Sequence, residues 1–216
     1  MSKIYDTFLF DLDGTITDSA LGITNSVMYA LRKFGIEETD RTKLYKFIGP
    51  PLTESFEKFY GFTKEQSLKG VRYYREYYQD KGIYENKVYD GLEDVLKKMN
   101  DAGKCVIVAT SKPEKYAKLI IEYFGLTKYF ACVAGMEMDG ARGTKAEVIA
   151  YALEKNHITD KTKVLMIGDR EHDVIGAHKN ELDCLGILYG FGDREELEEA
   201  GAEYIRDNVE DILEFV

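Results

Sequence analysis

The chain has 216 residues, of which 44% are apolar, so it can bury a full hydrophobic core and still carry a modest second module. Its 29 basic and 39 acidic residues give a net charge of −10, which excludes the overall positive field that would hold a nucleic acid polymer or an anionic membrane. No signal-like stretch opens the chain and no apolar run approaches the roughly 18 residues of a membrane span, so we expect a cytoplasmic protein.

The first 86 residues predict one strand followed by a helical block. Residues 7–10 form a short apolar run that is typical of a strand. Helical periodicity then dominates residues 16–86, and Thr63 with Gln66 has the spacing of a capping box, which marks a helix start. Helices are expected at residues 21–34, 41–47, 52–59 and 64–80.

From residue 104 onward, β-rich apolar runs alternate with amphipathic stretches, which predicts a parallel sheet with helices on both faces. Strands are expected at residues 106–109, 131–134, 164–167 and 186–188, and helices at 113–124, 145–154, 174–180 and 195–200. Cys105, Cys132 and Cys184 lie in or beside the strand runs and suit buried thiols better than disulfides or a zinc site. The sequence therefore predicts an α/β core of residues 1–15 and 87–216, with a helical cap domain over residues 16–86.

Two aspartates, Asp11 and Asp13, follow the first predicted strand. Strand alternation points both side chains the same way, at the C-terminal edge of the sheet. Two carboxylates so close are costly unless a cation lies between them or one stays protonated. An Asp-Gly turn at residues 13–14 is the simpler explanation, but it would not require Asp11.

A second acidic pair, Asp169 and Asp173, follows the strand expected at residues 164–167. Their spacing of four residues lets both face one site if a helical turn begins between them. Magnesium prefers oxygen ligands and takes few carboxylates, so Asp11 and Asp169 would suffice for it. Asp173 could instead be a charge favoured by the start of a helix, and we expect His172 at the surface or behind the site.

Two further strand ends offer groups that could bind phosphate. Thr110 ends one strand, and Ser111 with Glu114 has capping-box spacing, so we expect Ser111 to cap a helix while Thr110 faces the anion together with nearby backbone N–H groups. Thr144 and Glu147 form a second capping box that places Lys145 in a first helical turn. A lysine there opposes the helix dipole, which indicates a role such as neutralising phosphate.

Taken together, these motifs resemble the haloacid dehalogenase superfamily, specifically its phosphatases with a helical cap of the C1 type. Four motifs occur in order along the whole chain: residues 11–15 with the sequence DLDGT, then Thr110, then Lys145, then Asp169 with Asp173. Residues 17–19 and 48–52 are similar in style to the phosphoglycolate phosphatase and 5′-nucleotidase branches. The resemblance implies a three-layer α/β/α Rossmann-like core with a mostly parallel sheet.

The resemblance also implies a mechanism. Asp11 is the nucleophile that forms an aspartyl phosphate, and Asp13 is the general acid and base. Mg²⁺ is held by Asp11, Asp13 through its backbone carbonyl, and Asp169. Thr110, Ser111 and Lys145 contact the phosphate, and Asp173 orients Lys145 or a metal-bound water. The expected substrate is a small phosphomonoester, either phosphoglycolate or a nucleoside 5′-monophosphate.

Several alternatives stay open on sequence alone. A phosphomutase acting on a sugar phosphate shares every core motif, and a non-catalytic phosphate-binding module is a third possibility. In the helical block, Tyr74, Tyr77 and Tyr78 share a face that either packs the block or stacks on a nucleotide base. The loop at residues 48–52 is either a substrate contact or a turn between helices. We expect a monomer or a homodimer.

Overall fold

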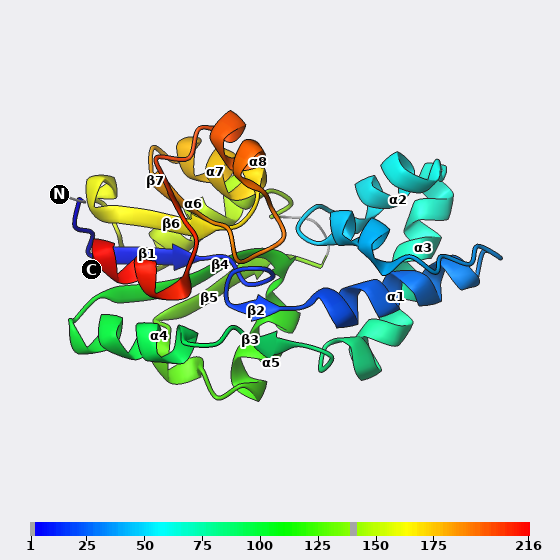
Figure 1. Ribbon diagram of the computed structural model, residues 1–216, viewed down its shortest axis with the longest axis horizontal. Coiled ribbons are helices and arrows are strands. Elements are labelled where there is room, and N and C mark those ends of the chain that lie inside the picture. The colour runs from blue at the N-terminus through cyan, green and yellow to red at the C-terminus, as the bar shows by residue number, and fades with distance from the viewer. Residues whose placement is uncertain (1–2, 139–141) are drawn as a thin grey trace. The chain divides into compact units, whose positions relative to one another are not determined.

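The computed structural model describes residues 3–138 and 142–216, and the chain divides into two compact units. Unit 1 comprises residues 1–17 and 88–216, and unit 2 comprises residues 18–87. The chain passes between them at β2 (Thr17–Asp18) and β3 (Lys87–Val88), which pair in a two-stranded sheet. Figure 1 shows the elements of each unit.

Unit 1 is built on a six-stranded sheet with the strand order β5-β4-β1-β6-β7-β8. All of its neighbouring strands are parallel, so their C-terminal ends meet at one edge. The strands are β1 (Thr7–Phe10), β4 (Cys105–Pro113), β5 (Cys132–Met136), β6 (Val164–Gly168), β7 (Asp183–Ile187) and β8 (Tyr204–Arg206). Strand β1 lies at the centre, where Leu9 is in register with Ile107 of β4 and Met166 of β6.

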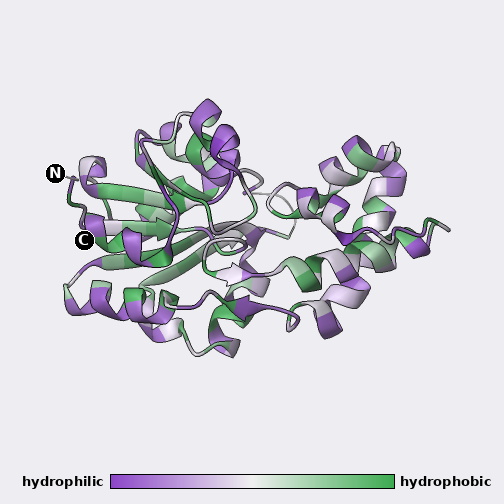
Figure 2. Cartoon of the chain, in the orientation of Figure 1, coloured by the Kyte–Doolittle hydropathy of each residue, from purple (hydrophilic) through white to green (hydrophobic). Residues whose placement is uncertain are grey.

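Helices cover both faces of this sheet, which gives the three-layer α/β/α arrangement (Figure 1). They are α4 (Leu92–Asp101), α5 (Glu114–Tyr123), α6 (Lys145–Lys155), α7 (Glu171–His178) and α8 (Arg194–Ala200), with short 3₁₀ turns at Thr127–Tyr129, Lys161–Lys163 and Val209–Phe215. Leu9, Ile107 and Met166 pack with the buried faces of α6 and α7 in one core cluster. Figure 2 shows the strands as hydrophobic and the outer helix faces as hydrophilic. The α/β fold class predicted from the sequence is confirmed.

Unit 2 is helical. It contains α1 (Ala20–Arg32), a 3₁₀ segment (Arg41–Phe47), α2 (Leu52–Tyr60), α3 (Lys64–Tyr77) and a π-helical turn (Tyr78–Gly82). The capping box of Thr63 and Gln66 is present and starts α3, as predicted. Tyr74 and Tyr78 are buried and their rings stack with centroids 5.2 Å apart, so these two side chains pack the unit.

Four local features differ from the sequence predictions. Ser111 caps no helix, because β4 continues to Pro113 and α5 begins only at Glu114. Helix α4 was missed because it follows Gly91, which offers no side-chain cap, and strand β8 was missed because its three residues are only half buried. The strand predicted at residues 186–188 begins three residues earlier and spans Asp183–Ile187.

The cysteines behave as the sequence predicts. Cys132 and Cys184 are buried, Cys105 is half buried, and all three are free thiols. Among the described residues, no helix has the length and apolar character needed to cross a membrane.

Leu9→Ala should reveal how strongly the fold depends on the central strand. Leu9 is fully buried in the core cluster that the sheet forms with α6 and α7, so we expect the free energy of unfolding to fall by about 2–5 kcal/mol. Leu119→Ala, on the exposed face of α5, is the matched control and should change it by less than about 0.5 kcal/mol. Urea denaturation measures both, and equal losses would contradict the packing described here.

Candidate active site

The site lies at the C-terminal edge of the central strands of unit 1. Asp11 follows β1, Thr110 lies near the end of β4, and Asp169 follows β6. Since β4, β1 and β6 are neighbours in a parallel sheet, their ends bring these three residues together from distant parts of the sequence. Lys145 and Asp173 join them from the first turns of α6 and α7.

Lys145 connects two of the carboxylates. Its Nζ lies 2.6 Å from Oδ1 of Asp11 and 2.7 Å from Oδ1 of Asp173, and it also donates to the carbonyl oxygen of Ala109 at 2.9 Å. The side chain is 4% exposed. The capping box of Thr144 and Glu147 is present, as predicted, and it fixes the helix start from which Lys145 projects. Although burial alone would lower it, the pKa of Lys145 is raised by Asp11 and Asp173, so the amine stays charged.

Two hydrogen bonds hold the carboxylate of Asp169. Thr15 donates to its Oδ1 at 3.2 Å, and the backbone N–H of Phe191 donates to its Oδ2 at 2.8 Å. Gly14 adopts a left-handed φ of +90°, and a Cβ there would fall 2.2 Å from Oδ2 of Asp169. The glycine is therefore required by both the turn and the close approach of the two loops.

Asp13 has a different partner. Its Oδ2 accepts from Nζ of Lys112 at 2.6 Å, and both side chains are at least nine-tenths buried. Its side chain is not part of the carboxylate cluster of Asp11, Asp169 and Asp173, which each offer an oxygen within 4.8 Å of the others. The backbone carbonyl of Asp13 therefore remains its predicted contribution to a metal site.

Thr110 and Ser111 are consecutive residues of β4 that differ in burial. Thr110 is buried, and its hydroxyl accepts from the backbone N–H of Lys112 at 3.2 Å. Ser111 is half buried and, as noted above, is not a helix cap. His172, on α7, is partly exposed beside Glu171.

Burial makes the carboxylates difficult to ionise. Desolvation raises the pKa of Asp11 to about 6, and it also raises the pKa of Asp169, with Asp173 adding to both shifts. Four buried carboxylates face two buried ammonium groups, those of Lys112 and Lys145, so the formal excess is two negative charges. One divalent cation would balance that excess. The residues present therefore fit a magnesium ion, whose preferred ligands are oxygens.

The sequence did not identify two contacts that shape this site. Lys112 pairs with Asp13, and Phe191 supplies a backbone N–H to Asp169. Side chains two residues apart in a strand point to the same side, which is why Asp11 and Asp13 were expected to lie together. The same rule applies to Thr110 and Lys112, so it could have identified Lys112 as a candidate site residue. A backbone donor 22 residues from its acceptor leaves no signal in the sequence.

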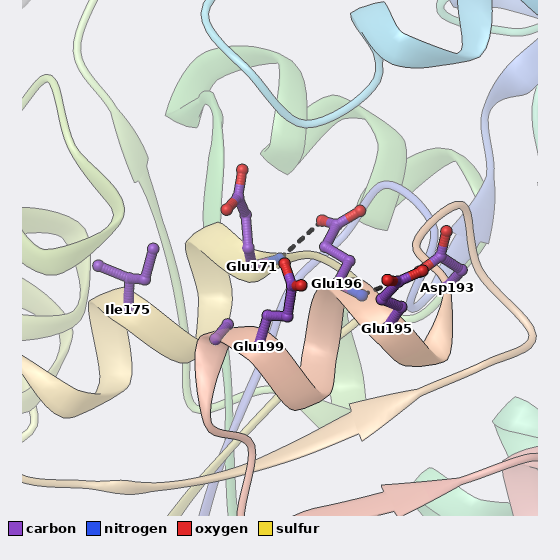
Figure 3. Close-up of a pocket in the computed structure, with 7 residues that line it drawn as sticks. Glu171, Ile175, Asp193, Glu195, Glu196 and Glu199 are labelled. Atoms are coloured by element: carbon purple, nitrogen blue, oxygen red, sulfur yellow. Dashed lines mark hydrogen bonds between the residues drawn. The ribbon is translucent and has the colours of Figure 1, made fainter.

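A separate hollow of about 550 Å³ lies on the surface between α7 and α8. Figure 3 shows the residues that line it: Glu171 and Ile175 from α7, with Asp193, Glu195, Glu196 and Glu199 at and along α8. Glu196 accepts from the N–H of Glu171 at 2.8 Å and from Nε of Arg170 at 2.7 Å, which ties the loop after Asp169 to α8. Its acidic lining would repel a phosphate ester, so this hollow is not the candidate site for a phosphate ester.

Comparison with known proteins agrees with this geometry. Residues 8–187 match the family model described as haloacid dehalogenase-like hydrolase. The chain belongs to this family. It is 43% identical over 193 residues to a protein named 5′-nucleotidase from Pseudomonas aeruginosa, covering 89% of this chain and 87% of that protein. A crystal structure of a predicted phosphatase from Clostridium acetobutylicum shares 49% identity, covers 98% of both chains and has a TM-score of 0.94.

A further relative carries a different name. The chain is 36% identical over 185 residues to tyrosine-protein kinase PtkA of Mycobacterium tuberculosis, covering 85% of this chain but only 62% of that protein. The family predicted from the sequence motifs is thus confirmed, and its members include proteins with more than one named activity.

Removing the ammonium group of Lys145 should destabilise the fold. In Lys145→Met, buried Asp11 and Asp173 lose their shared cation, so we expect a loss of about 3–5 kcal/mol at pH 8 in the presence of chelator. Lys155→Met removes the same charge from the exposed end of α6 and should cost less than about 0.5 kcal/mol. Chemical denaturation compares them, and a similar small loss in both variants would contradict the buried ion pairs.

The stability difference between Asp11→Asn and the wild-type protein should depend on pH. The pKa of Asp11 is raised from 3.8 to about 6 in the fold, so its charge destabilises the folded state as pH rises through that range. In chelator, the variant should therefore gain about 3 kcal/mol relative to the wild type between pH 4 and pH 7. Urea unfolding at several pH values tests this, and a difference independent of pH would contradict the burial penalty.

Proposed function

We propose that this chain is a magnesium-dependent phosphatase that hydrolyses a small phosphomonoester through an aspartyl-phosphate intermediate. The observation that carries the proposal is the buried carboxylate of Asp11 at the edge of the sheet, next to Lys145 and within a cluster that carries excess negative charge. A carboxylate at the surface is solvated by water and needs no nearby cation. A carboxylate nucleophile that must approach an anionic phosphate needs positive charge beside it, because the two anions repel each other.

Asp11 is the proposed nucleophile. Its carboxylate oxygen forms a bond to phosphorus while the bond between phosphorus and the ester oxygen breaks, and water later releases phosphate from Asp11. Splitting the reaction this way replaces one difficult displacement by two easier ones. Lys145, already in contact with Asp11, lies where it can offset the negative charge that both groups bring together.

Asp11 and Asp169 would hold the magnesium ion through their side chains, with the backbone carbonyl of Asp13 as a third ligand. The bound ion would supply positive charge that offsets the repulsion between carboxylate and phosphate. Thr15 and the N–H of Phe191 keep Asp169 in place for this role. Asp173 would act through Lys145, which it orients by their ion pair.

Asp13 is the proposed acid and base, and Thr110 is proposed to bind the phosphate, with Ser111 beside it. Asp13 would give a proton to the departing ester oxygen and then take one from the attacking water. The hydroxyl of Thr110, which accepts from the N–H of Lys112, would provide a neutral donor for the transferred phosphoryl group.

Among the expected substrates, we favour a nucleoside 5′-monophosphate over phosphoglycolate. The support is the relative named 5′-nucleotidase, which is 43% identical over most of both chains. Unit 2 is the proposed cap that selects the leaving group, with the loop at residues 48–52 as a candidate contact. Because Tyr74 and Tyr78 are buried against each other, they are poor candidates for stacking on a base. A phosphomutase and a non-catalytic binder are the alternatives.

Asp11→Asn should abolish turnover and leave the fold intact. The amide is isosteric but a weak nucleophile, so we expect phosphate release to fall at least about 10³-fold. Asp6→Asn, an exposed position just before β1, is the control and should retain full activity. Circular dichroism checks the fold, and near-wild-type activity in the Asp11 variant would rule out the covalent mechanism.

A substrate panel tests the function itself. Phosphate release is measured for nucleoside monophosphates, phosphoglycolate, sugar phosphates and 4-nitrophenyl phosphate, each with magnesium and with chelator. We expect metal-dependent release, fastest from a nucleoside 5′-monophosphate. Conversion of a sugar phosphate without phosphate release would favour the mutase, and binding of phosphate without turnover would favour the non-catalytic module.

A further inference from the structure

The two carboxylate oxygens of Asp13 have different environments. Oδ2 accepts from Nζ of Lys112 at 2.6 Å, in a contact whose side chains are only 10% and 6% exposed. Oδ1 is buried and has no hydrogen-bond partner within the described part of the chain. A buried carboxylate oxygen without a partner is costly, so its persistence beside the site indicates that a ligand group completes it.

The backbone around Lys112 is shaped to aim the side chain at Asp13. Strand β4 pairs with β5 in regular register up to Thr110, and the register then shifts so that Ser111 and Lys112 form a bulge before Pro113. The bulge lies over Gly135 of β5, where a Cβ would fall 2.6 Å from the carbonyl oxygen of Lys112. Bulges of this kind re-aim side chains next to functional sites.

We propose that Lys112 is a positioning residue for proton transfer: by donating to Oδ2 of Asp13, it fixes the carboxyl group so that Oδ1 carries the proton to and from the substrate. The inference rests on the proposed function, because it assigns an atom to the acid–base step. An acid must lie within hydrogen-bonding reach of the leaving oxygen, and a carboxyl group held at one oxygen presents the other in a fixed direction.

The proton moves between Asp13 and the reacting oxygen in both steps of the reaction. As the bond from Asp11 to phosphorus forms and the ester bond breaks, the proton on Oδ1 of Asp13 passes to the departing oxygen. In the second step, water attacks phosphorus, the bond to Asp11 breaks, and a proton of the water returns to Oδ1. Lys112 donates a hydrogen bond to Oδ2 throughout and loses no proton.

A merely structural ion pair would behave differently from a positioning pair. If Lys112 only stabilised the fold, its removal would slow all substrates alike. If it positions the acid, the loss should grow as the leaving group becomes a stronger base, because only such leaving groups need a proton when the ester bond breaks. Aryl phosphates of similar size but different leaving-group acidity separate these cases.

The experiment compares kcat/KM for phenyl phosphate and 4-nitrophenyl phosphate with magnesium in the wild type, Lys112→Met and Lys112→Arg. We expect Lys112→Met to lose on the order of 10²-fold on phenyl phosphate and at least about tenfold less on 4-nitrophenyl phosphate. Lys112→Arg retains a hydrogen-bond donor but displaces it, so its kcat/KM for phenyl phosphate should lie between those of the wild type and Lys112→Met. Lys115→Met, at an exposed position in the first turn of α5, should match the wild type on both.

A double variant shows whether Lys112→Met lowers activity through Asp13 or by destabilising the fold. In an Asp13→Asn background, Lys112→Met should cost almost nothing further on phenyl phosphate if Lys112 acts only through Asp13. Equal losses on both esters, or fully additive losses in the double variant, would overturn the positioning role while leaving the phosphatase intact. A wild-type protein that releases phosphate neither from these esters nor from any nucleoside 5′-monophosphate would overturn the proposed function, and this inference with it.

Discussion

The structure depends on burying several carboxylates at one edge of a parallel sheet. Asp11, Asp169 and Asp173 bring oxygens within 4.8 Å of one another, and all three side chains are buried. Lys145 meets two of them, and without its charge the edge would be strongly repulsive. The helix start that carries Lys145, the glycine turn at Gly14 and the hydrogen bonds to Asp169 all act to make this arrangement possible.

Local sequence signals predicted most of this framework because they depend on short-range physics. The strand at residues 7–10 and the capping boxes of Thr63 and Thr144 were predicted correctly from spacing alone. Asp11 and Asp169 were placed at the same edge because both follow apolar strands, and parallel strands end together. These inferences required no knowledge of the distant contacts.

The features that were missed depend on contacts between distant segments. The expected cap at Ser111 had the right residue types, but pairing with β5 keeps residues 111–113 in the strand, so tertiary structure outweighs the capping signal. The pairing of Lys112 with Asp13 requires both a bulge in β4 and a glycine opposite it in β5. Neither requirement can be inferred from one segment alone, because each depends on the register between two strands.

Lys112 and Lys145 each neutralise different carboxylates of the site. Lys145 lies between the carboxylates of Asp11 and Asp173, whereas Lys112 pairs with Asp13. Each proposed chemical role, nucleophile and acid–base, thus has its own ammonium group. Such separation lets the charge at the nucleophile be compensated without moving the proton-transferring group, because the two ion pairs share no atom. The remaining uncompensated charge lies around Asp169, which is where a divalent cation would gain most from binding.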